Sequence, residues 1–382
     1  MSPSGIADAF ASLEDPRREH GQLHPLLDII TIAICAVISG AETWVDIVDF
    51  GEDKEEWLRG FLELPSGIPS HDTFARVFQL LDPQQVQLCY QDWISSIKPV
   101  LAEGDIVAID GKTLRRSHDH RQAKSALHLL HAWSVEAGLV LGKRAVDAKS
   151  NEIPEIPELL KLLYLKGCIV TLDAMGCQKD IVKSIVSEHG ADYVIALKEN
   201  QGSLYDTAQS LFAYADARHP RLIGQYSHTE EISKPRGRVE RRVCEVMTDV
   251  AVLNDLSQQE GWTGLQSLVR VQHAQLLDGQ WQNTQTRYFI SSLQEKDANQ
   301  LLRTIRSHWH IENKLHRVLD VTFRQDDSRI RVGHSPENFA VLQHIALALL
   351  KKHPKKISLR RKRLQSARND KLRWQILNAF SK

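Results

Sequence analysis

Several familiar functional signatures are missing from this chain of 382 residues. Its five cysteines are widely scattered and form no C-x-x-C pair, so the sequence favours reduced structural thiols over a disulfide framework. No G-x-x-x-x-G-K-[ST] or G-x-G-x-x-G loop occurs, which argues against an ATP-driven or dinucleotide-dependent enzyme. The histidines His308, His310 and His316 cluster without further ligands at tetrahedral spacing, which argues against a zinc site.

Long apolar runs and a net charge are absent as well. The longest apolar run, roughly residues 26–38, is interrupted by Asp28 and is shorter than the ~20 residues of a membrane-spanning helix. No basic, hydrophobic, cleavable leader opens the chain, so we expect a cytoplasmic protein with no membrane partner. The 48 basic and 48 acidic residues cancel, so the overall charge gives no support to nucleic-acid binding.

The charge is nevertheless unevenly distributed. Eleven Lys or Arg residues and a single acid, Asp370, lie between Lys351 and Arg373. A basic C-terminal tail at 351–382 could neutralise phosphates. The alternative for such a composition is a solvated, partly disordered terminus.

The first hundred residues are typical of a helical N-terminal domain, 1–100. Apolar runs with helical spacing are followed by helix-stop signals at Pro65, Pro69 and Pro83. The segment 68–78 predicts a helix capped by Ser70. Such a helix could read a DNA groove, but a helix packed in a bundle is the more common outcome of this pattern.

From residue 105 the pattern changes to that of a mixed sheet. The run Ile106–Asp110 predicts a strand that ends in a carboxylate and a Gly-Lys turn, and two further runs predict a hairpin with Gly138 in its turn. A helix, a second strand ending in an acid, another helix and another strand follow, at 157–165, 168–173, 178–188 and 193–197. The order βββαβαβ predicts the first part of a ribonuclease H-like core at 101–204.

The rest of the chain is divided by the same criteria. Residues 205–293 are β-leaning and polar, which predicts a β-rich insertion with strands near 238–247, 265–272 and 286–291. The helical period returns at 297–319, so the segment 294–350 is predicted to complete the core. We therefore expect an α/β fold with a ribonuclease H-like catalytic core, βββαβαβ and then a helix, plus the insertion and the helical domain.

Three carboxylates occupy positions where an acid is costly. Asp110 and Asp173 end buried-type strands, and Glu312 lies on the apolar stripe of the long helix together with Ile305 and Trp309. A buried carboxylate has to be paired, hydrogen-bonded or bound to a metal ion. Taken singly, Asp110 could be a turn residue, Asp173 a helix N-cap and Glu312 a partner of a neighbouring histidine. Together, on the predicted strand order, they favour a metal site.

Phosphodiester chemistry gives three carboxylates a role. Two Mg²⁺ ions about 3.5 to 4 Å apart can clamp the attacking and leaving oxygens of an in-line displacement. Hard oxygen ligands suit Mg²⁺, with Mn²⁺ as a substitute. Asp110 would bridge the ions, Asp173 would hold one ion and Glu312 the other.

Other charged residues surround this predicted site. Asp320 lies two helical turns beyond Glu312 and is a rival for the position of third ligand. Lys112, Arg115 and Arg116 follow the first acid closely enough to contact phosphates.

Three ordered motifs resemble those of the H-repeat-associated insertion-sequence transposases. They are Ile109–Arg116, Asp173–Gln178 and Trp309–His316, and similar segments at 15–18, 69–74, 193–201 and 319–331 extend the resemblance over the whole chain. The resemblance implies a DDE catalytic domain of ribonuclease H-like fold with Asp110, Asp173 and Glu312 as the metal-binding triad. It implies Mg²⁺-dependent cutting of insertion-sequence ends and joining to target double-stranded DNA.

The chain departs from related transposases on the helix that bears the glutamate. Those enzymes carry Tyr, Arg and Lys at fixed offsets, where this chain has Ile305, His308 and Leu319. We do not transfer the roles of those side chains. The predicted substitutes for DNA contact are Arg306, His308 and Trp309, with Lys198 in the segment 193–201. Because two DNA ends have to be paired, we expect a homodimer on DNA, associated with the nucleoid.

Two other functions remain open for this sequence. One is a non-catalytic DNA-binding descendant of a transposase, and the presence of all three acids weighs against it. The other is a ribonuclease H-like nuclease that cuts without joining, and the β-leaning insertion and the length of the resemblance weigh against it. Both a hairpin-forming and another cleavage route fit the residues.

Overall fold

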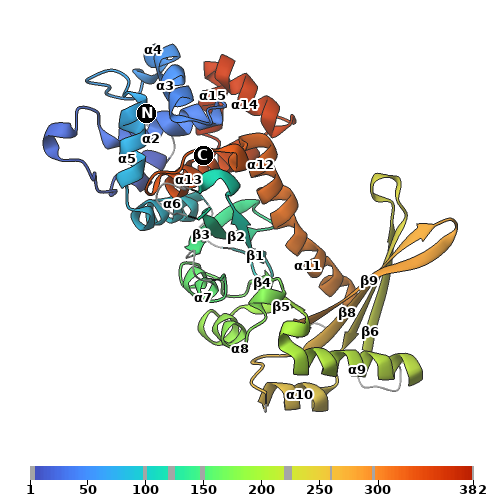
Figure 1. Cartoon of the computed structure of the whole chain (residues 1–382). Coiled ribbons are helices and arrows are strands. Elements are labelled where there is room, and N and C mark those ends of the chain that lie inside the picture. The colour runs from blue at the N-terminus through green and yellow to red at the C-terminus, as the bar shows by residue number, and fades with distance from the viewer. Residues whose placement is uncertain are drawn as a thin grey trace.

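The computed structural model describes residues 5–97, 101–118, 125–146, 151–218, 226–258, 260–294 and 297–380. This part of the chain forms one nine-stranded sheet with helices on both faces, next to a helical cluster built from both ends of the chain (Figure 1). The mixed α/β class predicted from the sequence is confirmed. No helix among the described residues is long and apolar enough to cross a membrane.

The N-terminal helices surround one apolar helix. They are α1 (Ile6–Phe10), α2 (Leu26–Ile38), α3 (Trp44–Asp53), α4 (Glu55–Leu58), α5 (His71–Leu80) and α6 (Pro83–Ile97). α2 is apolar on all sides and is therefore buried between its neighbours, among them α13 (Ser335–Lys352). In α5, Ser70 accepts a hydrogen bond from the Thr73 amide, as the cap prediction requires. α5 buries Phe74 and Val77 in the bundle, while Arg76 stays exposed.

The basic C-terminal segment is folded, so the disordered-tail alternative is wrong for its two helices, α14 (Leu359–Arg368) and α15 (Asp370–Leu377). Both pack against α2 and α13. Arg363 donates to the carbonyls of Val37 and Ala41 at the end of α2, at 3.2 and 3.3 Å. The Arg373 guanidinium is fully buried and lies 4.2 Å from the centre of the Trp57 ring. Such buried basic groups stabilise the helical cluster and are withdrawn from phosphates, because their hydrogen-bonding capacity is used inside the protein.

The sheet joins strands that are far apart in the sequence. Its order is β3-β2-β1-β4-β5-β9-β8-β7-β6. The strands are β1 (Ile106–Thr113), β2 (His128–Ser134), β3 (Leu139–Val146), β4 (Ile169–Leu172), β5 (Asp192–Leu197), β6 (Tyr226–Ser233), β7 (Glu240–Met247), β8 (Ser267–Leu277) and β9 (Gln280–Ser291). β1, β4 and β5 are parallel, and the other pairs are antiparallel. The β2–β3 turn contains Gly138 at a φ of 66°, a conformation that favours glycine, as predicted.

β1 is longer than predicted, and the expected Gly-Lys turn is wrong. The ladder with β2 continues through Gly111 and Lys112, which pair with Leu130 and Leu129. Gly111 is required by close approach and not by a turn, because a Cβ at this position would lie 2.0 Å from a carboxylate oxygen of Glu152. Asp110 is therefore a residue within the strand.

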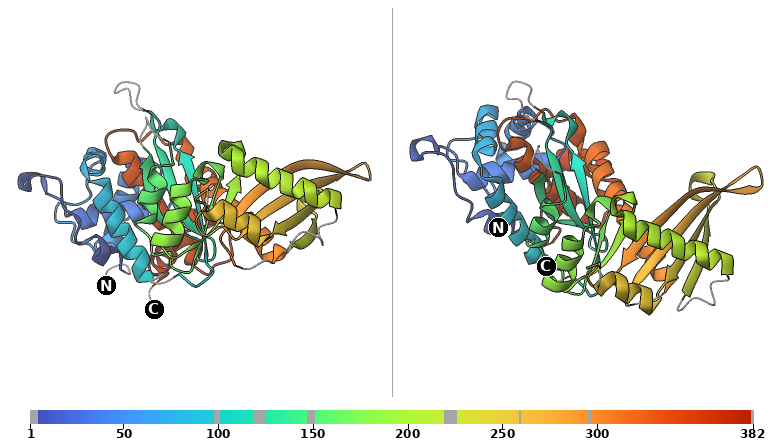
Figure 2. Two further views of the ribbon diagram at one scale, coloured as in Figure 1. Left: turned by 90° about the horizontal axis from the view of Figure 1, so that it is seen from below. Right: turned by 60° about the horizontal axis from the view of Figure 1, so that its bottom comes forward.

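Helices cover both faces of the sheet. They are α7 (Glu155–Leu160), α8 (Lys179–Lys183) with the π-helical turn η5 (Ser184–Glu188), α9 (Gly202–Arg218), α10 (Val250–Gln258) and α11 (Ala298–Ile311). Short turns complete the set: η1 (Glu19–Gly21), η2 (Arg115–Ser117), η4 (Ala174–Gly176), η6 (Glu199–Gln201), η8 (Pro235–Gly237) and η10 (Gln325–Asp327). Figure 2 shows β6–β9 with α9 projecting away from the helical cluster. β6, α9 and α10 were not predicted, and they make the insertion a mixed α/β element.

α9 and α11 lie on opposite faces of the inserted strands. Arg270 of β8 stacks on Phe212 of α9. Its neighbours Val269 and Val271 belong to the apolar cluster of α11, which also contains Leu302. Because neighbouring strand residues point to opposite faces, the two helices enclose the sheet.

The helix that follows the insertion continues beyond its predicted end. α11 runs into the π-helical turn η9 (Glu312–His316) and then into α12 (Arg317–Phe323). Ile305 is buried as expected, but Trp309 is 46% exposed, so its predicted place on a buried stripe is wrong. The reason is that a cavity, and not a packed sheet surface, lies beside this turn of the helix.

Candidate active site

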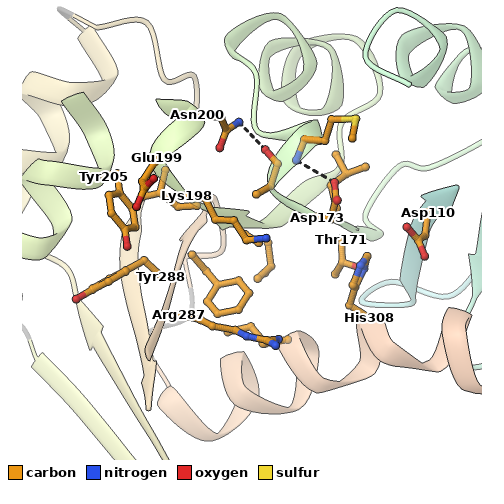
Figure 3. Close-up of a pocket in the computed structure, with 18 of the residues that line it drawn as sticks. Asp110, Thr171, Asp173, Lys198, Glu199, Asn200, Tyr205, Arg287, Tyr288 and His308 are labelled. Carbon is orange, nitrogen blue, oxygen red and sulfur yellow. Dashed lines mark hydrogen bonds between the residues drawn. The ribbon is translucent and has the colours of Figure 1, made fainter. Parts of the chain in front are cut away.

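Two neighbouring strands bring Asp110 and Asp173 to one side of the sheet. Ile106 and Ile169 lie four residues before the two acids, and both pack in the apolar cluster of α11. Because alternate strand residues share a face, each acid points to the α11 side. β1 and β4 are parallel neighbours, so both acids line one cavity of about 950 Å³. Figure 3 shows Asp110 and Asp173 at this cavity beside His308 of α11.

Glu312 reaches the same cavity from the helix. The ligand atoms of Asp110, Glu312 and His316 all lie within 4.8 Å of one another, an acid and histidine cluster that could hold a metal ion. The Glu312 side chain is 52% exposed, so it stands at the cavity mouth and does not enter a dry interior as predicted. It begins the π-helical turn η9, a helix irregularity that is frequent at functional sites.

The electrostatics of the cavity disfavour three ionised acids. Burial raises the pKa of Asp110 to about 8, with further contributions from Glu312, Glu152 and Asp173. Among the described residues, no Lys or Arg pairs with Asp110, Asp173 or Glu312. A divalent cation would supply the missing positive charge.

Asp173 also acts as a helix cap, the simpler role that the sequence left open. One of its carboxylate oxygens accepts from the amides of Met175 and Gly176, at 3.0 and 3.4 Å. These bonds fix the orientation of the carboxylate and leave the other oxygen for a ligand. The cap and the metal-ligand role are therefore compatible.

Two histidines, the half-buried His308 and the buried His316, flank the acids and have lowered pKa values. His308 shares a hydrogen bond of 3.0 Å with the Thr171 hydroxyl, and burial lowers its pKa. Burial, with a smaller effect of Lys112, lowers the pKa of His316 to about 3. A neutral imidazole can accept a hydrogen bond or bind a metal ion. The sequence showed the histidine cluster, but the proximity of His316 to Asp110 depends on the fold.

Lys112 does not face the open cavity. Its side chain is 7% exposed and its ammonium pairs with Asp320 at 2.6 Å and with Asp326 at 3.1 Å. Because β1 continues, Lys112 lies on the same face as Asp110 and meets α12. The Lys112 ammonium is therefore engaged inside the protein in this structure, and its phosphate contact stays a prediction. Asp320, the rival ligand, is held by Lys112 and is not part of the acid and histidine cluster.

The other predicted basic residues are distributed over the surface. Arg115 is 81% exposed and lies 3.2 Å from Asp326, and Arg116 is half exposed and lies 3.6 Å from Asp327. Arg306 pairs with Glu231 of β6. Lys198 is exposed and lines the cavity with the acids.

The insertion supplies a cavity wall that the sequence did not reveal. Arg287 and Tyr288 of β9 line the cavity, and the Arg287 guanidinium lies 5.0 Å over the Trp309 ring. Figure 3 shows Lys198 and Arg287 extending toward the side where Asp173 and His308 lie. β9 pairs with β5, and this pairing over about ninety residues of sequence is what brings Arg287 here. No local signal in the sequence indicates it.

A basic groove of about 700 Å³ adjoins the cavity between α11 and the inserted strands. It shares Arg287 and Trp309 with the cavity and is also lined by Arg242, Arg303 and Arg306. Its described lining contains no Asp or Glu side chain. Arg242 and Arg306 pair with Glu240 and Glu231 beside the groove, so its positive charge is partly compensated.

Comparison with known proteins agrees with these features. The family model described as "Transposase DDE domain" matches residues 101–349, and the model described as "DDE_Tnp_1-associated" matches residues 7–94. The "H repeat-associated putative transposase YhhI" of Escherichia coli (strain K12) is 40% identical over 374 residues, 96% of each chain. The "Putative transposase YncI" of Escherichia coli O157:H7 is 39% identical over 353 residues, 92% of this chain and 88% of the other.

A solved piggyBac transposase synaptic complex with hairpin DNA aligns more distantly. The TM-score is 0.43 at 12% identity, over 95% of this chain and 75% of that chain, which is too distant to support an argument about the fold. The family models and the relatives cover nearly the whole chain. Because the transposase model alone matches well over half of its residues, this chain belongs to the DDE transposase family.

Proposed function

We propose that this protein is a DNA transposase with a ribonuclease H-like core that cuts insertion-sequence ends and joins them to target DNA. The order β1-β2-β3-α7-β4-α8-β5 and the sheet order β3-β2-β1-β4-β5 support the core assignment. The single observation that carries the proposal is the uncompensated acid cluster. Asp110 and Glu312 are two hundred positions apart in the sequence, yet both line one cavity with Asp173 and without a Lys or Arg partner among the described residues.

The residues fit a divalent cation. Carboxylate oxygens are the ligands that Mg²⁺ and Mn²⁺ prefer, and burial together with the neighbouring acids raises the pKa of Asp110. Asp110, Asp173 and Glu312 would hold the metal. A metal bound there would supply Lewis-acid activation of the attacking water or 3′-hydroxyl and charge neutralisation at the leaving oxygen.

The protein's own residues would bind and orient the DNA. Lys198 and Arg287 line the same cavity as the acids, and they would hold phosphates near the scissile bond. Trp309 presents an exposed ring beneath Arg287, a surface on which a base can stack. The basic groove beside it would carry the DNA backbone away from the acids.

Two DNA ends have to be held together for joining, so we propose that the protein acts as a homodimer on double-stranded DNA. The measurement is analytical ultracentrifugation with and without DNA ends. A monomer that binds and joins two ends by itself would contradict this part of the proposal.

The function is tested with a duplex that carries the terminal repeat flanking the coding region. The assay measures cleavage and strand transfer with Mg²⁺, for the wild type and for Asp110→Asn, Asp173→Asn and Glu312→Gln. We expect each substitution to lower both rates at least a thousandfold, because an amide is a weak ligand for a hard cation. Asp320→Asn is the matched control, since Asp320 pairs with Lys112 and is outside the cluster.

Each other outcome selects a different function. Cleavage without strand transfer would identify a nuclease. Binding of the ends without cleavage in Mg²⁺ or Mn²⁺ would identify a non-catalytic DNA-binding protein. Loss of activity in Asp320→Asn with retention in Glu312→Gln would reassign the third ligand.

A further inference from the structure

His316 occupies the gap between two of the three acids. Its Nδ1 lies 3.6 Å from Asp110 Oδ2 and 3.9 Å from Glu312 Oε2. Both distances exceed the ~3.2 Å limit of an ordinary N–H···O hydrogen bond, so Nδ1 is bonded to neither acid. Two ligands that each lie ~2.1 Å from one ion are roughly 3.0 to 3.6 Å apart, so a small inward movement of these side chains would enclose an ion.

The imidazole is held in this position by the protein interior. Its side chain is 6% exposed, and its Nε2 is buried without a hydrogen-bond partner in the described chain. The ring lies 5.4 Å from the ring of His131, which in turn lies 5.1 Å from the ring of His344. A ring packed in this way cannot turn into solvent, so Nδ1 stays directed at the acids.

The histidine that lines the cavity, His308, makes different contacts. His308 uses its Nδ1 in the hydrogen bond with Thr171, and it is not part of the cluster of ligand atoms. His310 is half-buried, its Nδ1 lies 3.3 Å from the Lys314 ammonium, and it lines the neighbouring groove. Of these three imidazoles, only that of His316 is buried, unbonded at Nδ1 and directed at two carboxylates.

We propose that Nδ1 of His316 is a direct ligand of the metal ion held by Asp110 and Glu312, so that this position is a mixed nitrogen and oxygen site. The inference rests on the proposed function for the presence of the ion and adds a ligand and a metal preference to it. Imidazole nitrogen raises affinity for Mn²⁺ and later first-row ions much more than for Mg²⁺. The site should therefore select Mn²⁺ over Mg²⁺ more strongly than a site with oxygen ligands alone.

The test is pulsed electron paramagnetic resonance of the full-length protein with one equivalent of Mn²⁺. We expect nitrogen modulation of the Mn²⁺ signal in the wild type, and a change of its frequency when histidine is labelled with ¹⁵N. His316→Gln should remove the modulation and weaken Mn²⁺ binding roughly tenfold or more, while Mg²⁺ binding weakens less than about threefold. His308→Gln and His310→Gln are the matched controls, and both should keep the modulation.

The outcomes separate this inference from the proposed function, because the readout is metal binding and not activity. Absence of histidine modulation in the wild type, or its persistence in His316→Gln, overturns the inference even if DNA is cut and joined. If His316→Gln does not fold, the labelled wild type and His308→Gln still decide: modulation that is lost in His308→Gln assigns the ligand to His308. An inactive protein that shows the His316 signal keeps the ligand assignment and overturns the transposition proposal alone.

Discussion

Two groups of acids lie beside the continuous helix formed by α11, η9 and α12, and their charges are compensated in opposite ways. At the cavity, Asp110, Asp173 and Glu312 have no Lys or Arg partner within the described ranges. Next to it, Asp320 and Asp326 share the buried ammonium of Lys112. Both groups contain carboxylates close to β1, so residue type and proximity alone do not distinguish them.

The difference lies in where the positive charge comes from. A buried ion pair supplies its own cation, and breaking it leaves an uncompensated charge. An acid cluster without a cation is unfavourable in the metal-free protein, and the raised pKa of Asp110 expresses this. A fold that keeps such a cluster gains from a cation that arrives from solution. The comparison therefore separates a structural ion-pair network from a candidate metal site.

The largest effect on stability is expected when the compensated group loses its cation. Lys112→Met removes the cation that pairs with Asp320 and leaves Asp326 with the exposed Arg115 alone, which should lower the free energy of unfolding by about 3 kcal/mol. At roughly 2 to 4 °C per kcal/mol for a protein of this size, the Tm should fall by about 10 °C. Thermal unfolding followed by circular dichroism measures it. The control is Lys198→Met at the cavity edge, and equal Tm changes in the two variants would remove the basis of the comparison.

A change of opposite sign is expected at the cavity. Asp110 has a pKa of about 8 in the folded protein against an ordinary value near 3.8, so the folded state binds the additional proton between these limits. The unfolding free energy of the metal-free protein therefore falls as pH rises from about 4 to 8. Above pH 8 the ionisation of Asp110 causes no further change in it. Asp110→Asn removes this dependence and should raise the Tm at pH 8 but not near pH 4.

The measurement is Tm against pH in the presence of a chelator. Asp320→Asn serves as the control, and it should lower the Tm because Lys112 then keeps Asp326 alone. A wild-type Tm that rises between pH 5 and 8 with the same slope in Asp110→Asn would show that Asp110 is not destabilised by its surroundings.

The sequence predicts those parts of the structure that depend on local periodicity. The strands around Ile106, Ile169 and Val194 and the helix that begins near Asp297 were found from apolar runs, and their order led to the three acids. The end of β1 was placed too early, because the apolar run stops at Ile109 while the backbone pairing with β2 does not. The pattern of apolar and polar residues indicates which side chains are buried, but it does not indicate how far the backbone hydrogen bonds between two strands continue.

The remaining parts of the site depend on long-range pairing. Arg287 reaches the cavity only because β9 pairs with β5, and Lys112 is neutralised only because α12 packs beside β1. The sequence predicted that Lys112, which follows the predicted catalytic residue Asp110 closely, contacts phosphates, and the fold gives its ammonium internal carboxylate partners. The buried arginines of the C-terminal helices, such as Arg373, show the same limit, since composition does not reveal which charges are satisfied inside the protein.

The smallest effect concerns two arginine side chains, one without and one with a carboxylate partner, and it extends the comparison to DNA binding. In the described chain Arg287 has no carboxylate partner, whereas Arg116 lies 3.6 Å from Asp327. Arg287→Gln should weaken binding of a terminal-repeat duplex by a few-fold. It should also reduce the slope of log Kd against the logarithm of the salt concentration by about one, which corresponds to the loss of one phosphate contact. Arg116→Gln should have less effect on both, because its charge is already partly neutralised. Fluorescence anisotropy over a salt series gives both quantities, and equal losses in the two variants would show that compensation does not decide which arginines contact DNA.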